Sequence, residues 1–245
     1  MPRYRLDLAY DGSGFHGFAR QSGEVRTVGG VLEDALERVF RQPVKVTVAG
    51  RTDTGVHARH QVVSFDAERP VDPSKLVRAI NSMLGPEVAA TAATMVSDDF
   101  SARFDARART YRYHIDDSEV ADPLRRHTVW HVGVALDVPR MHEAAQGFVG
   151  DHDFASFCRR REGFGTERTV HEAAVWRADD GLVVFEITAK AFCHQMVRSL
   201  TGLLVDIGRH RRPPESVVEA LSARNRSVVP SPAPPNGLVL WHVTY

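Results

Sequence analysis

Hydrophobic residues in the first hundred positions recur with a period of two in some segments and about 3.6 in others. The first pattern is typical of half-buried strands and the second of amphipathic helices. Thr27 stands where a helix N-cap is expected, and Pro43 follows the same helical segment as a stop signal. The order is βαββαβ. The predicted elements are strands over 3–10, 44–48, 60–65 and 88–96 and helices over 27–42 and 73–84.

The same order of elements recurs after about residue 104, although no sequence repeat is visible. The predicted elements are strands over 109–115, 168–177, 182–189 and 237–244 and helices over 137–148 and 195–209. We therefore predict an α+β fold of two ferredoxin-like halves, residues 1–104 and 105–245, each with an antiparallel sheet against two helices. The Pro-rich stretch 230–235 is predicted to be an ordered or semi-rigid connection.

Composition indicates a globular protein. The chain has 245 residues, 43% of them hydrophobic and 25% charged, and its 31 basic residues balance 31 acidic ones. The N-terminus lacks the apolar segment of a signal peptide, and no apolar run is long enough to span a membrane, so we expect a cytoplasmic protein. Cys158 and Cys193 form no Cys-x-x-Cys pair and are not expected to build a disulfide framework, which fits a reducing compartment.

The segment from Gly50 to Ala58 carries the strongest chemical signal. A lone carboxylate, Asp53, lies between glycines in a loop that joins two predicted strands. Arg51 is two residues away, so in an extended loop its guanidinium would lie on the same side and favour the ionised carboxylate that a nucleophile or base requires. The other interpretation is a structural Asp-x-Gly turn with a local ion pair, and spacing alone favours it.

Two other kinds of site are weighed and disfavoured. Residues 53–55, Asp-Thr-Gly, match the active-site triplet of aspartic peptidases, but those enzymes need two carboxylates and an all-β fold. His57-x-x-His60 lacks the glutamate of a zinc-binding His-Glu-x-x-His helix, so no metal site is predicted. A non-catalytic RNA-binding protein with sheets like those of the RNA-recognition motif is the remaining alternative.

The longer motif, Gly-Arg-Thr-Asp-Thr-Gly-Val-His-Ala, closely resembles the active-site motif of the tRNA pseudouridine synthase A family. Five further segments are similar to motifs of that family and occur in the family's order. They are residues 10–17, 98–113, 150–157, 192–198 and 237–240. The resemblance therefore covers nearly the whole chain.

The resemblance implies isomerisation of uridine to pseudouridine at positions 38–40 of the tRNA anticodon stem-loop, without cofactor or metal, in a cleft between the two halves. Asp53 would be the catalytic carboxylate, Tyr111 would stack on the target uracil, and Arg51 and Arg198 would lie beside the carboxylate. A homodimer is also implied. RNA contacts are implied for Arg20, Gln21, His57 and Arg109.

The N-terminal region departs from the family pattern. Phe18-Ala19 stands where Trp-Gln is usual, and Gly29 where Gln is common, which affects the expected RNA contacts rather than the chemistry. Two segments carry an excess of arginine despite the zero net charge: four against one acidic residue in 101–114, and six against three in 198–226. These stretches are predicted to contact RNA phosphates.

Overall fold

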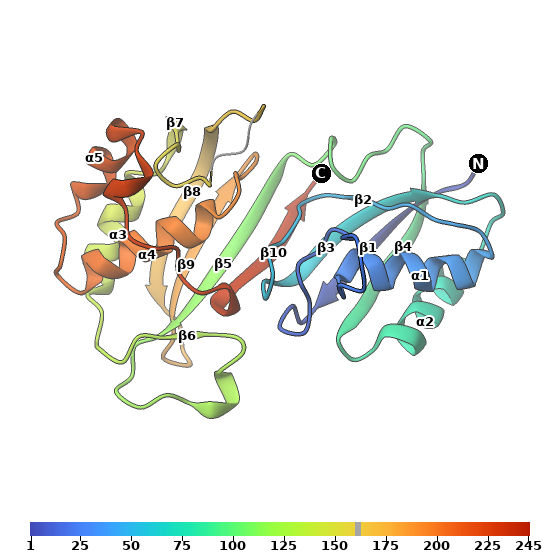
Figure 1. Cartoon of the computed structure of the whole chain (residues 1–245), viewed down its shortest axis with the longest axis horizontal. Coiled ribbons are helices and arrows are strands. Elements are labelled where there is room, and N and C mark those ends of the chain that lie inside the picture. Colours follow the sequence, from blue (N-terminus) through green and yellow to red (C-terminus); the bar gives the residue numbers. More distant parts are fainter. Residues whose placement is uncertain (160–162) are drawn as a thin grey trace. The chain divides into compact units, whose positions relative to one another are not determined.

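The computed structural model describes residues 1–159 and 163–245. The chain divides into two compact units: residues 1–107 with 239–245, and residues 108–238. Each unit combines helices with a mostly antiparallel sheet (Figure 1). The predicted α+β class is confirmed.

The sheet of the first unit has the strand order β4-β1-β3-β2, and these neighbouring strands are antiparallel. This is the ferredoxin-like order, in which the first and second strands are separated by the third. The helices α1 and α2 pack against each other (Figure 1). The elements are β1 (Arg3–Tyr10), α1 (Val28–Phe40), β2 (Thr47–Val48), β3 (His57–Asp66), α2 (Pro73–Leu84) and β4 (Val88–Val96).

Local sequence explains the limits of α1. The Thr27 side chain accepts a hydrogen bond from the Gly30 N–H, which confirms the predicted N-cap. The helix ends at Phe40, two residues before the predicted end, because Arg41 takes a left-handed conformation with φ of 58° and donates its N–H to the Glu37 carbonyl. The helix therefore ends before Pro43, which does not determine where it stops.

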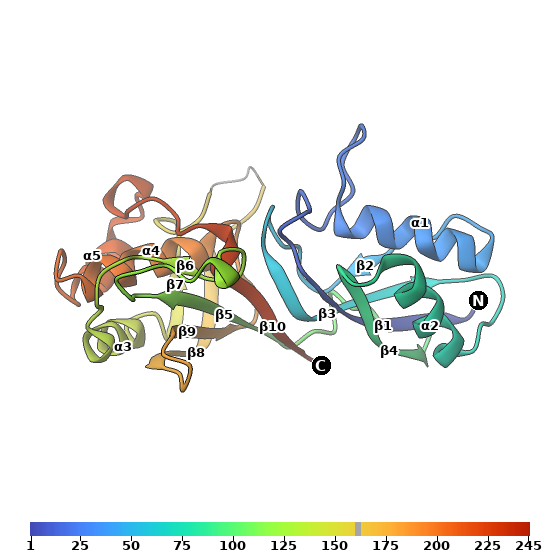
Figure 2. The same ribbon diagram turned by 90° about the horizontal axis from the view of Figure 1, so that it is seen from below.

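The second unit has the sheet order β5-β9-β8-β7, with β6 added in parallel to β5. The helices α3 and α4 pack against each other, and α3 contacts β8 (Figure 2). Sequence patterning did not predict β6, β7 or α5. The elements are β5 (Ala108–Asp116), β6 (Trp130–His131), α3 (Val138–Gln146), β7 (Gly150–Asp153), β8 (Glu167–Arg177), β9 (Val183–Ala189), α4 (Met196–Gly208) and α5 (Ser216–Ala223). Short 3₁₀ turns lie at Pro123–Arg125, Arg226–Val228 and Pro235–Gly237.

The last strand, β10 (Leu238–Thr244), belongs to the first unit from Val239 onward, where it pairs in parallel with β3 through Val239 opposite His57. Strand β3 begins at His57 and not at residue 60 as predicted. The difference arises because Ala58 pairs with Tyr10 of β1 and with Leu240 of β10, contacts that local sequence does not show.

The cysteines are a second correction. Cys158 and Cys193, which were not expected to build a disulfide framework, are joined as a disulfide with Cα atoms 5.6 Å apart. They are 35 residues apart in sequence, and the fold brings together the segment after β7 and the segment before α4, a proximity that sequence spacing cannot reveal.

The Pro-rich stretch is ordered against α4, as predicted. Ala233 donates its N–H to the Arg198 carbonyl at 2.9 Å, and the Tyr113 hydroxyl donates to the Pro234 carbonyl at 2.6 Å. No helix within residues 1–159 or 163–245 is long and apolar enough to cross a membrane.

Candidate active site

Asp53 lies in the first unit, in the loop between β2 and β3, and its side chain is half-buried. Its carbonyl accepts a hydrogen bond from the Val56 N–H at 3.1 Å, which closes a four-residue turn. Gly55, the third residue of this turn, has φ of 78°, a conformation that favours glycine. The chain therefore reverses directly after Asp53, so that the carboxylate stands where the loop turns.

A second Gly-rich segment, residues 12–18, holds this loop in place. Phe18 donates its N–H to the Thr52 carbonyl at 3.1 Å, and Gly55 donates to the Phe15 carbonyl at 3.3 Å. Gly12 packs so closely that a Cβ there would lie 2.0 Å from the Val56 carbonyl oxygen. Backbone on both sides of Asp53 is thus fixed by residues more than thirty positions away in sequence.

Buried side chains support the loop from below. The Tyr10 hydroxyl and Thr52 Oγ1 are 2.8 Å apart, and Gln61 donates through Nε2 to the Gly50 carbonyl at 2.6 Å. Burial raises the pKa of Tyr10 to about 12, so its hydroxyl stays neutral and available for hydrogen bonding. Sequence reasoning missed this network. Its signal was a glutamine, Gln61, in a strand whose following residues are mostly apolar.

Arg51, predicted to lie beside Asp53, and His57, predicted to contact RNA, flank Asp53 in sequence and differ in their surroundings. Arg51 is exposed in the segment directly before the turn that starts at Asp53. His57 is buried and accepts a hydrogen bond at Nδ1 from the Gly12 N–H at 3.0 Å. His57 therefore supports the loop from inside the unit.

Tyr111 lies in the second unit, on β5, opposite Ile187 of β9. Its side chain is 8% exposed, and its ring meets the ring of Phe192 edge to face, with centroids 5.0 Å apart and an interplanar angle of 83°. Edge-to-face contact fixes the plane of the Tyr111 ring. Phe192 is the supporting residue that sequence reasoning did not assign a role.

Arg198 lies in the first turn of α4 in the second unit and is half-buried. Its Nε donates to the Ala233 carbonyl at 2.7 Å, while the Ala233 N–H donates to the Arg198 carbonyl. The guanidinium is therefore oriented by the ordered Pro-rich segment.

The residues predicted to contact RNA have partners within the protein. Arg20 forms ion pairs with Glu33 and Asp34. Gln21 is exposed and donates to the His16 carbonyl at 2.8 Å. The other predicted residue, Arg109, is 9% exposed and donates to the Lys190 carbonyl at 2.8 Å.

The arrangement in the first unit is that of a single, rigidly placed carboxylate. Its loop is held by backbone hydrogen bonds and a buried polar network, as a group that must meet a reacting atom requires. The second unit separately holds an aromatic ring and a guanidinium in fixed orientations, the two groups suited to a planar base and an anion.

Comparison with known proteins gives a consistent result. A model of the tRNA pseudouridine synthase family matches residues 8–105 and 144–245. A protein of Frankia casuarinae named tRNA pseudouridine synthase A is 46% identical over all of this chain and 90% of its own length. The proteins of the same name from Limosilactobacillus fermentum and Listeria monocytogenes are 41% and 39% identical over all of this chain, and over 96% and 100% of their own lengths.

A structural likeness is remote. A chain in a crystal structure of a Cbf5-Nop10-Gar1 complex aligns with 82% of this chain and with 54% of its own length, at 12% identity. The TM-score of 0.32 is too low to support an inference. The sequence matches extend over the whole chain and include the Asp53 loop. The chain belongs to the tRNA pseudouridine synthase family.

Proposed function

We propose that this enzyme converts uridine to pseudouridine at positions 38–40 of the tRNA anticodon stem-loop, with Asp53 as the catalytic group. Family membership supports the reaction, and the observation that carries the assignment of Asp53 is its position at a turn clamped on both sides by backbone hydrogen bonds. The 1–104 half carries this carboxylate, and the 105–245 half contributes Tyr111 and Arg198.

The reaction breaks the N1–C1′ bond of uridine, turns the base and joins C5 to C1′. The proton on C5 is lost to solvent and N1 gains a proton, so no atom other than hydrogen is exchanged. The Asp53 carboxylate acts in one of two ways: it adds to C1′ as the base leaves, or it removes the proton at C2′ to give a glycal. A single carboxylate is sufficient for both.

The target base must leave its stack before a carboxylate can reach its sugar, which costs a few kcal/mol. Stacking on an aromatic side chain is worth about 1–3 kcal/mol per base and offsets much of that cost. Tyr111 supplies this ring in the proposal, because Phe192 holds its plane fixed. The Tyr111 hydroxyl is a candidate for proton transfer at C5.

The remaining site residues take roles suited to their surroundings. Arg51, exposed in the Asp53 loop, and Arg198, in the first turn of α4, provide positive charge toward the RNA and the carboxylate. Arg20, Gln21 and Arg109 provide RNA contacts while they are held by protein partners. His57 acts on RNA binding through the loop it supports.

We also propose a homodimer in the cytoplasm, the compartment in which tRNA is modified. Light scattering at micromolar concentration tests the dimer. Disulfides are rare in reducing compartments, so alkylation of the thiols in protein lysed under denaturing conditions tests whether Cys158 and Cys193 are joined in cells.

Release of tritium from an unmodified tRNA transcript labelled at C5 of uridine tests the proposed reaction. The wild-type enzyme is expected to release tritium from a transcript with uridines at positions 38–40. A matched transcript with cytidines at those positions and labelled uridines elsewhere is expected to release none. Equal release from both transcripts, or none from either, would contradict the proposed specificity or the proposed reaction.

A further inference from the structure

Several arginines of the second unit form ion pairs with carboxylates of the same unit. Arg112 pairs with Glu186 at 2.6 Å, and Arg177 pairs with Asp117 at 2.8 Å. Arg224 pairs with Asp153 at 3.2 Å. These three guanidinium groups are paired within the protein. An excess of arginine in the sequence is therefore not sufficient to identify an RNA-contact surface.

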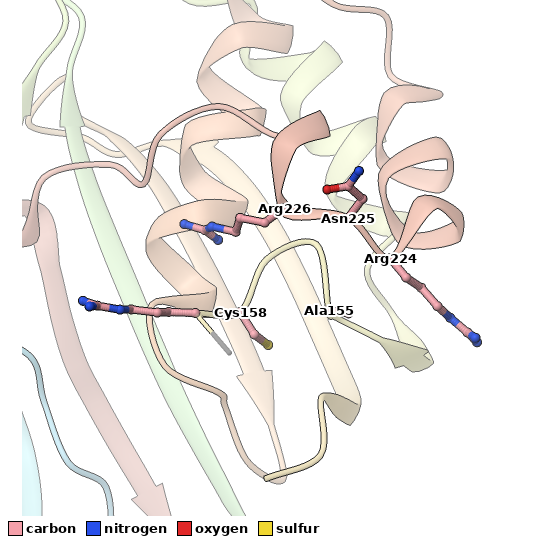
Figure 3. Close-up of a pocket in the computed structure, with 6 residues that line it drawn as sticks. Ala155, Cys158, Arg224, Asn225 and Arg226 are labelled. Atoms are coloured by element: carbon pink, nitrogen blue, oxygen red, sulfur yellow. The ribbon is translucent and has the colours of Figure 1, made fainter. Parts of the chain in front are cut away.

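Arg226 and Arg159 differ from these three arginines in their partners. Among residues 1–159 and 163–245, no carboxylate forms an ion pair with the side chain of either. Both line one cavity of about 410 Å³ in the second unit, shown in Figure 3. The other lining residues are Ala155, Cys158, Arg224 and Asn225.

The guanidinium of Arg226 is held in a fixed position. Its Nη1 donates to Ser199 Oγ at 2.7 Å, and the fully buried Ser199 hydroxyl in turn donates to the Gln195 carbonyl at 2.9 Å. Burial and the charge of Arg198 both lower the pKa of Arg226, which means that its charge lacks full compensation. An anion bound beside it would supply that compensation.

The cavity also adjoins the amino end of α4. Arg159 donates its backbone N–H to the His194 carbonyl at 2.9 Å, and Cys158 is bonded to Cys193, so the cavity wall is attached to the residues that directly precede the helix. The N-cap of α4, Gln195, makes no side-chain capping bond. The positive end of the helix dipole thus adds to the two guanidinium charges.

Figure 3 shows Arg226 together with Arg224, which lies two residues earlier in the chain. Their side chains extend in opposite directions from the backbone, and Arg224 is the one paired with Asp153. The same short segment therefore presents one arginine that is held by a carboxylate and one that is held by a neutral hydroxyl.

We propose that this cavity binds a phosphodiester group of the substrate RNA, with Arg226 as its fixed contact and Arg159 as a second, adaptable one. The proposal rests on the proposed function for the identity of the RNA. An RNA phosphate fits because it carries one negative charge and because its two free oxygens accept hydrogen bonds from separate guanidinium groups. Two of the lining residues, Arg159 and Asn225, are exposed.

The experiment measures binding of an unmodified tRNA transcript by fluorescence anisotropy across a series of salt concentrations. Arg226→Ala is expected to weaken binding about tenfold, the effect of losing one charge-assisted hydrogen bond. It is also expected to reduce the slope of log K against log salt by about 0.7–0.9, the value for one phosphate contact. Arg125→Ala is the control, because Arg125 pairs with Asp122 at 3.5 Å and with Asp180 at 3.3 Å and does not line the cavity. It is expected to change binding less than about twofold, as for exposed ion pairs.

Arg226→Lys keeps the charge and is expected to retain the wild-type salt slope. Loss of the arginine leaves the Ser199 hydroxyl bonded to the Gln195 carbonyl, so this buried hydroxyl keeps a partner and the melting curves are expected to coincide. An unchanged slope for Arg226→Ala, or equal losses for Arg226→Ala and Arg125→Ala, would overturn the site. Tritium release by the wild type is read separately, so failure of the reaction and failure of the phosphate site are distinguishable.

Discussion

Substitution of Gly12 by alanine tests whether the Gly-rich segment 12–18 positions the loop that carries Asp53, the proposed catalytic residue. A Cβ at residue 12 would lie 2.0 Å from the Val56 carbonyl oxygen and 2.5 Å from its carbon. Contacts of a Cβ below 3.0 Å essentially do not occur, and both atoms belong to backbone and cannot rotate away. The two segments must therefore separate by about 1 Å to relieve the overlap.

This separation is expected to lower kcat. Misplacement of a catalytic group by about 1 Å costs on the order of 10²-fold in rate, and Val56 is three residues from Asp53 in the same turn. The strain is expected to cost about 1–3 kcal/mol of folding free energy. For a chain of this size each kcal/mol lowers Tm by about 2–4 °C, so the variant still folds at 25 °C.

Single-turnover tritium release with saturating enzyme measures the chemical step, and anisotropy measures tRNA binding. Gly165→Ala is the matched control, because a Cβ there meets nothing within 4 Å. Gly12→Ala is expected to lose about 10²-fold in rate while tRNA affinity changes little. A wild-type rate in Gly12→Ala would refute the claim that this contact sets the position of Asp53.

Three further variants test separate parts of the structure. Tyr10→Phe leaves the hydroxyl of Thr52 and the amide of Gln61 with one buried partner fewer, and urea unfolding is expected to show a loss of about 1–3 kcal/mol; a loss below about 0.5 kcal/mol would contradict the buried network. If Tyr111 acts by stacking, Tyr111→Phe is expected to keep most of kcat while Tyr111→Ala weakens tRNA use by about 10- to 100-fold; complete inactivity of the Phe variant would instead assign the chemistry to the hydroxyl. Hydrogen bonds from its arginine partner lower the pKa of Asp117, so its carboxylate stabilises the fold fully above the ordinary pKa near 4 and loses this effect as pH falls through the lowered value. Asp117→Asn is therefore expected to flatten the decline of unfolding free energy between about pH 5 and pH 3, and parallel curves for the two proteins would contradict this.

Sequence periodicity predicted the elements that lie within one unit and carry a strong pattern. The strands Arg3–Tyr10 and Val88–Val96 and the helix Pro73–Leu84 have the predicted bounds. The misses are short or depend on distant partners: the two-residue strand Trp130–His131 exists only because it pairs with β5, and the four-residue strand Gly150–Asp153 only because it pairs with β8. Such segments carry too few residues for a period to be visible.

The candidate site shows the same limit at the level of side chains. The motif identified Asp53, but not the contacts that hold it, since Gly12 and Tyr10 are about forty residues away in sequence. The glycines around Asp53 indicated a turn, but the partners that fix it, the backbone of Phe15 and Phe18, became visible only in the fold. Local spacing identifies chemistry, whereas positions depend on the tertiary fold.

Charge shows why counting residues is insufficient. Six arginines stand between residues 198 and 226, yet Arg211, Arg212 and Arg224 lie within 4.0 Å of carboxylates of the same unit. Ion pairing within the protein reduces the positive charge available to RNA. The salt dependence of tRNA binding is therefore expected to be set by a few arginines such as Arg226, not by the total.

The central claim is that Asp53 is the catalytic carboxylate, and Asp53→Asn tests it most directly because the amide has nearly the same shape and no charge. The variant is compared with the wild type in tritium release from C5-labelled tRNA and in tRNA binding. We expect release to fall by at least about 10²–10⁴-fold, the range for loss of an acid–base group, with binding largely intact. Release by Asp53→Asn at the wild-type rate would contradict the account.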